Sequence, residues 1–242
     1  HARTLTVALT TSVAPERLEA VAIDAAERLK EIVEEAAPGS DLQLQALKAF
    51  AKVARTGTQA ELVAGLLDGD VELVGLELDQ DLRWDLMYGL AAAGGAGIED
   101  RIAAELDRDP GAMGIRRAAG ARAAIGTPEA KVAAWDALMA GPSNATQYEI
   151  ARGTIHVTDP ALLASMWERM TGELDDYYAA NAGWVGSRVL QGLMPVMLAG
   201  RVDIAPVLES WLEAGDKPDV LRKIVSETLF EVKRALTAQQ VL

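Results

Sequence analysis

Apolar side chains recur along most of this chain at the spacing of one face of an α-helix. The three-then-four spacing is clearest over residues 162–170, 204–212 and 220–236. Such spacing gives each helix one apolar stripe that packs against a neighbour. Alternating strand patterns are nearly absent, the best being residues 154–158. The pattern predicts an all-α fold of about a dozen helices joined by short turns.

Helix starts are marked by residues that suit the free N–H groups of a first turn. Ser40 with Gln43, and Thr58 with Glu61, have the spacing of a capping box. Four prolines stand where a first turn accepts a residue without an N–H: Pro15, Pro128, Pro160 and Pro218. These residues place helix starts across the whole length of the chain.

The helices are expected to form pairs. Pair starts near Ile98, Glu129 and Ala161 lie about 32 residues apart, and a longer step leads to the last pair. A stack of helical hairpins curves and leaves a concave face that suits an extended ligand or another domain. We predict a single domain over residues 1–242, with the glycine-rich stretch 91–97 as the place where it would divide.

Composition and charge narrow the class of protein. Half of the 242 residues are hydrophobic, which is enough for a sizeable core. The 36 acidic and 23 basic residues give a net charge of -13, which repels a phosphate backbone, so we expect no nucleic-acid partner. No apolar run approaches the roughly 20 residues of a membrane span, and no leader precedes the first helix, so we expect no membrane and a cytoplasmic location. The chain begins with His1 instead of methionine, and we expect it to be a piece of a longer polypeptide.

The stretch LELDQDLRWDL, residues 76–86, raises the question of a metal or acid/base site. A calcium loop would place Asp79 and Asp81 at ligand positions. Such a loop also needs a glycine and a bidentate glutamate, at positions that here hold Leu82 and Tyr88. The stretch is better explained as a helix start in which Asp79 is the N-cap.

Catalytic chemistry is hard to assemble from the remaining residues. The chain has no cysteine, and its two histidines, His1 and His156, form no zinc-binding pattern. No nucleophile-elbow motif is present, so His156 is expected to be structural or at the surface. We predict no catalytic residue and no metal ligand. The five tryptophans lie mostly in helical stripes typical of a core, and a peptide groove lined by one or two of them is the alternative.

Residues 76–139, LELDQDLRWDLMYGLAAAGGAGIEDRIAAELDRDPGAMGIRRAAGARAAIGTPEAKVAAWDALM, resemble the C-terminal helical domain of actinobacterial aminopeptidase N, the endoplasmic reticulum aminopeptidase-like kind. GSRVLQGLMP, from residue 186, and DKPDVLRKIVSETLFEVKRAL, from residue 216, are similar to the same domain. The resemblance covers nearly the whole chain. Its motifs DLRW, RDPGAMG, TPEAKVAAW and PDVLRKIVSE are specific in combination.

This resemblance implies a fold and a role. The fold would be an α-superhelix of HEAT-like pairs that covers the catalytic cleft of a zinc aminopeptidase and helps to hold or size-select the peptide substrate. The G-A-M-E-N and H-E-x-x-H motifs of the family are not in this chain. Zinc and catalysis would therefore belong to an N-terminal catalytic domain of the same polypeptide, which with peptides would be the partner of this chain. The fragment alone would not be an enzyme.

Three residues in family-like helices are the predicted peptide-binding set: Arg83, Trp184 and Arg188. Arginine can bind a peptide carboxylate, and tryptophan can pack on a peptide backbone. The alternative is that they form intramolecular ion pairs and core contacts. Two other functions stay open, a stand-alone helical-repeat scaffold for a protein partner and an independent all-α enzyme. The second of these lacks an identifiable catalytic cluster.

Overall fold

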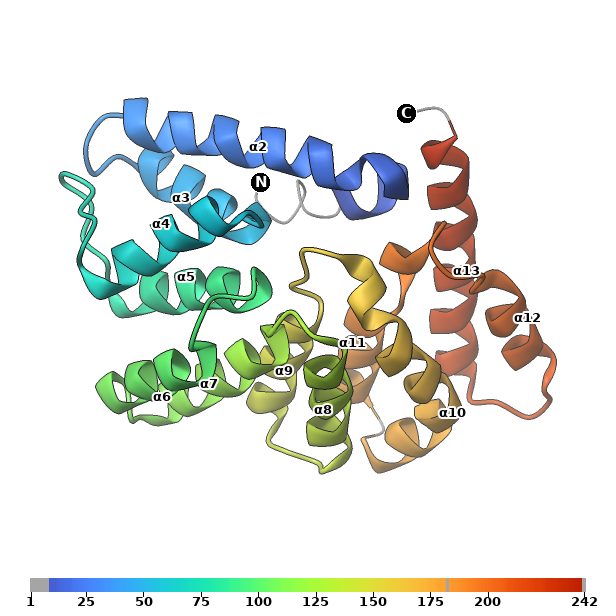
Figure 1. Ribbon diagram of the computed structural model, residues 1–242. Coiled ribbons are helices and arrows are strands. Elements are labelled where there is room, and N and C mark those ends of the chain that lie inside the picture. Colours follow the sequence, from blue (N-terminus) through green and yellow to red (C-terminus); the bar gives the residue numbers. More distant parts are fainter. Residues whose placement is uncertain (1–8, 182, 241–242) are drawn as a thin grey trace.

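Figure 1 shows the computed structural model, which describes residues 9–181 and 183–240. Every regular element in these residues is helical, and the prediction of an all-α fold is confirmed. The α-helices are, in chain order, α2 (Pro15–Glu35), α3 (Asp41–Val53), α4 (Gly57–Asp68), α5 (Gln80–Ala92), α6 (Ile98–Arg108), α7 (Ala112–Ala124), α8 (Pro128–Met139), α9 (Asn144–Thr154), α10 (Ala164–Ala180), α11 (Trp184–Leu193), α12 (Ala205–Glu213) and α13 (Asp219–Gln239). The 3-10 helices η1 (Pro160–Leu163) and η2 (Val196–Leu198) precede α10 and α12. No helix in the described ranges is long and apolar enough to cross a bilayer.

The predicted helix starts agree with the structure except at α4. Ser40 caps α3, since its hydroxyl accepts the N–H of Gln43 at 3.2 Å. The capping box predicted at Thr58 is wrong, because Thr58 lies inside α4 and the cap is Thr56. The backbone of Thr56 is extended, and its N–H donates to the side-chain oxygen of Gln59 at 3.3 Å. The Thr56 and Gln59 pair satisfies the same spacing rule two residues earlier.

The prolines mark four starts as expected. Pro15, Pro128 and Pro160 open α2, α8 and η1, while Pro218 is the residue before α13. The predicted pair starts near Ile98, Glu129 and Ala161 lie within one residue of the starts of α6, α8 and η1. This arrangement is compatible with HEAT-like pairs, and the repeat assignment itself stays a prediction.

The helices form two layers. Contacts run without a break from α3 through α5, α7, α9 and α11 to α13, and we call these helices the inner layer. Each of them also contacts the helix before it in the chain, and those partners, α2, α4, α6, α8, α10 and α12, are the outer layer. Among the outer helices the one substantial contact in the described chain is that of α8 with α10, so we propose that the unbroken inner layer is the concave side of the stack. Figure 1 accordingly places α12 outside α13 and α6 outside α7.

Glycines allow the inner helices to approach one another closely. A Cβ atom on Gly153 of α9 would lie 1.9 Å from the carbonyl oxygen of Gly120 on α7. A Cβ atom on Gly89 of α5 would lie 2.2 Å from the carbonyl oxygen of Ala51 on α3. Side chains of any other kind would therefore force these helix pairs apart.

Two buried apolar clusters meet on α7. One cluster packs helices α2 to α7 and includes Ala121 and Ala124, and the other packs α7 to α13 and includes Ala123. The glycine-rich stretch 91–97 joins α5 to α6, and both of these helices pack in the first cluster. We therefore propose that the described chain folds as one unit, because one helix carries apolar side chains into both clusters.

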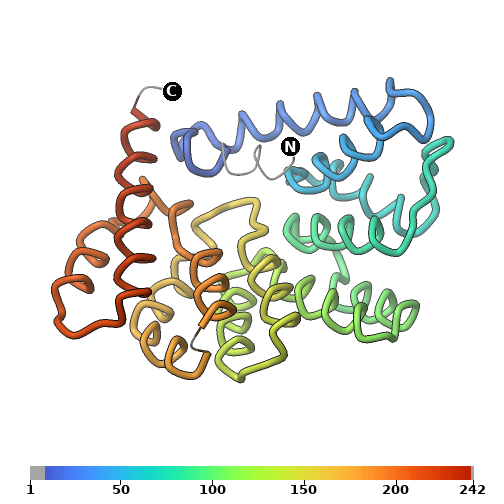
Figure 2. The backbone as a smooth tube through the Cα atoms, turned by 180° about the vertical axis from the view of Figure 1, so that it is seen from behind, coloured from blue at the N-terminus to red at the C-terminus, as the bar shows by residue number. Residues whose placement is uncertain are grey.

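The two ends of the described chain meet and close the curve. The side-chain amide of Gln239, at the end of α13, donates to the carbonyl oxygens of Thr11 and Ala199, each at 3.1 Å. Figures 1 and 2, seen from opposite sides, both show the start of α2 beside the end of α13. The stack is therefore a nearly closed ring and not an open arc.

We predict that Gly153→Ala lowers the free energy of unfolding by about 1–3 kcal/mol, because the added methyl group would collide with the backbone of α7. Gly172→Ala on α10 is the matched control. Its Cβ atom would meet nothing within 4 Å, and an alanine inside a helix should stabilise the protein by about 0.5–1 kcal/mol. Urea unfolding followed by circular dichroism would measure both. Equal effects of the two substitutions would contradict the close contact of α7 with α9.

Candidate functional site

The acidic stretch before α5 is a helix start, as predicted. The N–H of Leu82 donates to Oδ1 of Asp79 at 2.8 Å, which makes Asp79 the N-cap. Trp84 is fully buried, and its indole N–H donates to Asp109 at 3.0 Å. Among the described residues, no group of three or more His, Asp or Glu side chains is placed to hold a metal ion.

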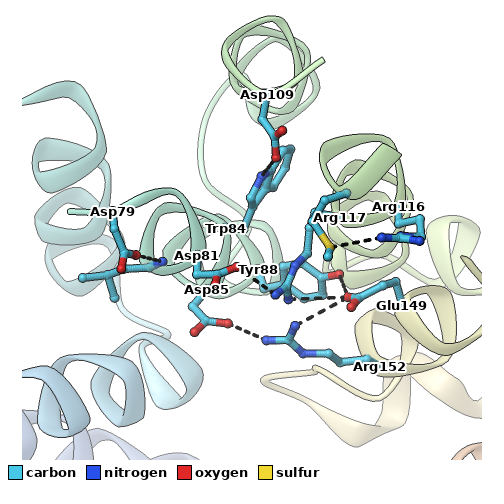
Figure 3. Close-up of polar contacts among 12 residues, drawn as sticks. Asp79, Asp81, Trp84, Asp85, Tyr88, Asp109, Arg116, Arg117, Glu149 and Arg152 are labelled. Carbon is cyan, nitrogen blue, oxygen red and sulfur yellow. Dashed lines mark hydrogen bonds and ion pairs between the residues drawn. The ribbon is translucent and has the colours of Figure 1, made fainter. Parts of the chain in front are cut away.

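A connected group of polar side chains crosses the inner layer (Figure 3). It joins α3, α5, α7 and α9, and we call it the inner-face network. Its members are Lys48, Asp81, Asp85, Tyr88, Arg117, Glu149 and Arg152.

Glu149 and Asp85 are the two centres of the inner-face network. The hydroxyl of Tyr88 donates to Oε2 of Glu149 at 2.8 Å, and Nη1 of Arg117 lies 3.7 Å from the same oxygen. Arg152 joins the two centres, because it pairs with Asp85 and also lies 3.5 Å from Glu149. The guanidinium of Arg152 stacks on the ring of Tyr88, 4.7 Å from its centroid.

The remaining members of the inner-face network, Lys48 and Asp81, pair with charges already described. Nζ of Lys48 lies 3.2 Å from Asp85, which therefore has two cationic partners. Nη2 of Arg117 lies 3.1 Å from Asp81, whose side chain is largely exposed. Three cations face three carboxylates, so the network carries no net charge. It ties four helices of the inner layer together.

Electrostatics fix the protonation states inside the network. Burial, followed by the charge of Glu149, raises the pKa of Tyr88 well above its usual value. Burial opposes ionisation of Asp85, but Arg152 and Lys48 outweigh it and hold the pKa of this carboxyl below its ordinary value. Tyr88 therefore stays a hydrogen-bond donor and Asp85 stays an anion at neutral pH. The network suits a rigid support for the inner face.

Arg83 lies on the side of α5 that faces the outer layer. Its guanidinium forms two hydrogen bonds with the carboxylate of Glu105 on α6, at 2.7 and 2.8 Å, and a third with the carbonyl oxygen of Leu67 on α4. Only 4% of the Glu105 side chain is exposed. Arg83 therefore ties α4, α5 and α6 together, and its predicted contact with a peptide stays a prediction.

Trp184 and Arg188 lie together on α11. Trp184 is 72% exposed and meets the ring of Tyr148 on α9 edge-on, with 6.1 Å between centroids. Arg188, one turn later, is also exposed. The structure thus places these two predicted residues on α11 of the inner layer, which α7 and α9 separate from α5, the helix of Arg83.

Two basic side chains are withdrawn from solvent, Lys131 in the first turn of α8 and the half-buried His156 just after α9. Lys131 is fully buried, and its ammonium group donates to the carbonyl oxygen of Ala123 at 2.7 Å. Burial lowers the pKa of Lys131 to about 7. Burial also lowers the pKa of His156 to about 3, assisted by nearby cations that include Lys52 and Lys131. Nε2 of His156 is buried and, within the described residues, has no hydrogen-bond partner.

The inner-face network was missed at the level of sequence. Asp85 and Arg152 are 67 residues apart, and their contact depends on how the helices stack. Only Glu149 and Arg152, spaced like neighbours on one helix face, leave a local signal. That signal is equally typical of any exposed helix.

Comparison with known proteins gives two matches. The sequence model of the ERAP1-like C-terminal domain matches residues 3–234. A protein named aminopeptidase N, from Streptomyces lividans, is 37% identical over 203 residues, which are 83% of this chain. The matched region is 24% of that relative, so the chain spans about a quarter of its length.

The buried amine of Lys131 predicts a specific dependence of stability on pH. In the folded chain the amine of Lys131 stays neutral down to about pH 7. In the unfolded chain its pKa has the ordinary value of 10.5, so the amine already binds a proton at a higher pH. The free energy of unfolding should therefore fall from pH 10 to pH 7, by up to about 1.4 kcal/mol per pH unit from this residue.

Lys131→Met should flatten this slope and raise stability at pH 7. Lys223→Met, at a side chain that is 73% exposed, is the control and should leave the slope unchanged. Urea unfolding at several pH values between pH 7 and pH 10 would measure the slope of the free energy of unfolding for each protein. A Lys131→Met variant with the wild-type slope would show that the amine is charged in the folded protein.

Proposed function

Because the chain belongs to the ERAP1-like C-terminal domain family, we propose that it is the non-catalytic helical domain of a zinc aminopeptidase. The observation that carries this proposal is the pair of matches to one family domain and to a protein named aminopeptidase N. The chain spans about a quarter of that relative, which leaves room for a separate catalytic part. The partner in this proposal is the N-terminal catalytic domain of the same polypeptide, and zinc would be bound there.

The role that we propose is to cover the catalytic cleft and to hold or size-select the peptide. A ring of helices has a concave inner layer on which an extended chain can lie. The inner-face network supports this layer, since it links α3, α5, α7 and α9 through neutralised charges. A rigid surface far from the reacting bond can supply binding energy that positions the substrate for cleavage.

Trp184 and Arg188 are the residues that we propose for the peptide contact. Both are exposed on the inner layer, where an aromatic ring can pack on a peptide backbone and a guanidinium can bind a carboxylate. Arg83 remains in the proposed set, but its guanidinium already donates hydrogen bonds to the carboxylate of Glu105 and the carbonyl oxygen of Leu67. A peptide would have to compete with those contacts.

Titration of this chain with uncharged peptides of four, eight and twelve residues, followed by calorimetry, tests the proposal. We expect affinity to rise with length, because a longer peptide covers more of the inner layer. Trp184→Ala should weaken binding of the longest peptide by about tenfold or less, the effect of losing one exposed aromatic contact. Binding of a folded protein partner, together with no binding of any peptide, would favour a scaffold function instead.

Arg83→Ala separates the two roles of that residue. The substitution leaves the buried Glu105 carboxylate without its partner, and we expect a loss of stability of about 2–4 kcal/mol. Thermal unfolding would measure this loss, and the peptide titration would be repeated below the unfolding range. Unchanged peptide affinity in the folded variant would remove Arg83 from the peptide-binding set.

A further inference from the structure

Most arginines in the described part of the chain reach a carboxylate or a backbone carbonyl. Those that reach neither are Arg17, Arg108, Arg116 and Arg188. Acidic residues outnumber basic ones by 36 to 23 in this chain, so carboxylates are in excess. An arginine without one therefore reflects its position and not a shortage of anions.

Two of these arginines lie on the inner layer, on α7 and α11. Among the described residues, the one hydrogen-bond partner of Arg116 is the sulfur of Met113, 3.5 Å from Nη2 (Figure 3). Arg188 is exposed, one turn after Trp184. Helix α9, which carries Tyr148, lies between α7 and α11 and contacts both. We call Arg116, Tyr148, Trp184 and Arg188 the arginine–tryptophan surface.

The surface is distinct from the inner-face network beside it. In the network, every carboxylate and every guanidinium or ammonium group has an opposite charge as a partner. Arg116 is next to Arg117 in the chain, but it is Arg117 that forms ion pairs with both Asp81 and Glu149. Asp81 and Glu149 are thus already paired, and neither Arg116 nor Arg188 has a carboxylate partner in the described chain.

We infer that the arginine–tryptophan surface binds acidic side chains of an extended peptide, with Trp184 packed against the peptide between two carboxylates. This inference rests on the proposed function and names the class of peptide that the domain would hold. Charge complementarity identifies the occupant, because guanidinium groups without an anionic partner prefer carboxylates, and Arg188 is exposed while Arg116 is half-buried. The exposed ring of Trp184, set edge-on against Tyr148, provides an apolar contact between the two charges.

Geometry favours acidic side chains over the terminal carboxylate of a peptide. Packed helices lie about 8–10 Å apart, and α7 and α9 approach more closely than that at Gly120 and Gly153, so the axes of α7 and α11, with α9 between them, are about 15–18 Å apart. A peptide has a single terminal carboxylate, whereas acidic side chains can supply a separate carboxylate to each of the two arginines. An extended peptide advances about 3.3 Å per residue, so two acidic residues about five apart would match the spacing.

The test uses this chain and three ten-residue peptides of alanine and glycine, all with amidated carboxyl ends. They carry glutamate, glutamine or lysine at the third and eighth positions. Trp84, Trp135 and Trp167 are buried and Trp211 is half-buried, whereas Trp184 is 72% exposed, so the part of the acrylamide quenching that Trp184→Phe removes reports on this surface. We expect the glutamate peptide to bind about five- to tenfold more tightly than the glutamine peptide at low salt, and the lysine peptide to bind least.

Arg116→Gln and Arg188→Gln should each reduce the preference for glutamate, and the double variant should abolish it. Arg17→Gln is the matched control, because Arg17 is an exposed, carboxylate-free arginine on α2 of the outer layer. It should leave the preference unchanged.

The outcomes separate this inference from the proposed function. Equal binding of all three peptides would overturn the inference and leave peptide holding intact. If the chain binds none of these three peptides and none of the uncharged peptides of four, eight and twelve residues, both the inference and the proposed function are overturned. The glutamine peptide is therefore also made with a free carboxyl end. If it then binds as tightly as the amidated glutamate peptide, and Arg116→Gln or Arg188→Gln removes that gain, the arginines bind the terminal carboxylate and the acidic side-chain role is contradicted.

Discussion

The backbones of α7 and α9 meet at Gly120 and Gly153, and the inner face depends on this contact. A Cβ atom on Gly153 would lie 1.9 Å from the carbonyl oxygen of Gly120, so only glycine lets the helices come so close. The same approach brings Glu149 within reach of Tyr88 and Arg117. Small residues at one crossing thus determine which charges can pair across the helices of the inner layer.

The pairing of these charges determines which groups of the inner face remain able to bind a ligand. Charges at the centre of the layer neutralise one another and stiffen it, and a surface with two unpaired arginines and an exposed tryptophan lies beside them. Such a division suits a domain that positions a substrate and leaves the chemistry to another part of the protein. We propose this division for the chain as a member of the ERAP1-like C-terminal domain family.

Local patterns in the sequence predicted local structure well. Helical periodicity and proline positions identified the helices, and Asp79 was identified as a cap because capping needs only neighbours in the chain. The error at Thr58 arose because two threonines near the start of α4 satisfy the same spacing rule. The inner-face network could not be predicted, since Asp85 pairs with Arg152 only after four helices have stacked. The location of Arg83 depended in the same way on Glu105, which the sequence alone does not place beside it.

Hydrolysis by the catalytic part of the parent protein, with and without this chain, tests the central claim most directly. The substrates would be a chromogenic single-residue compound and a series of peptides of increasing length, with zinc present. We predict no hydrolysis by the chain alone. Adding the chain to the catalytic part should change the preference for peptide length more than the rate on the chromogenic compound. Zinc-dependent hydrolysis by the chain alone, or a length preference that the chain does not change, would contradict the assignment of a non-catalytic, peptide-holding domain.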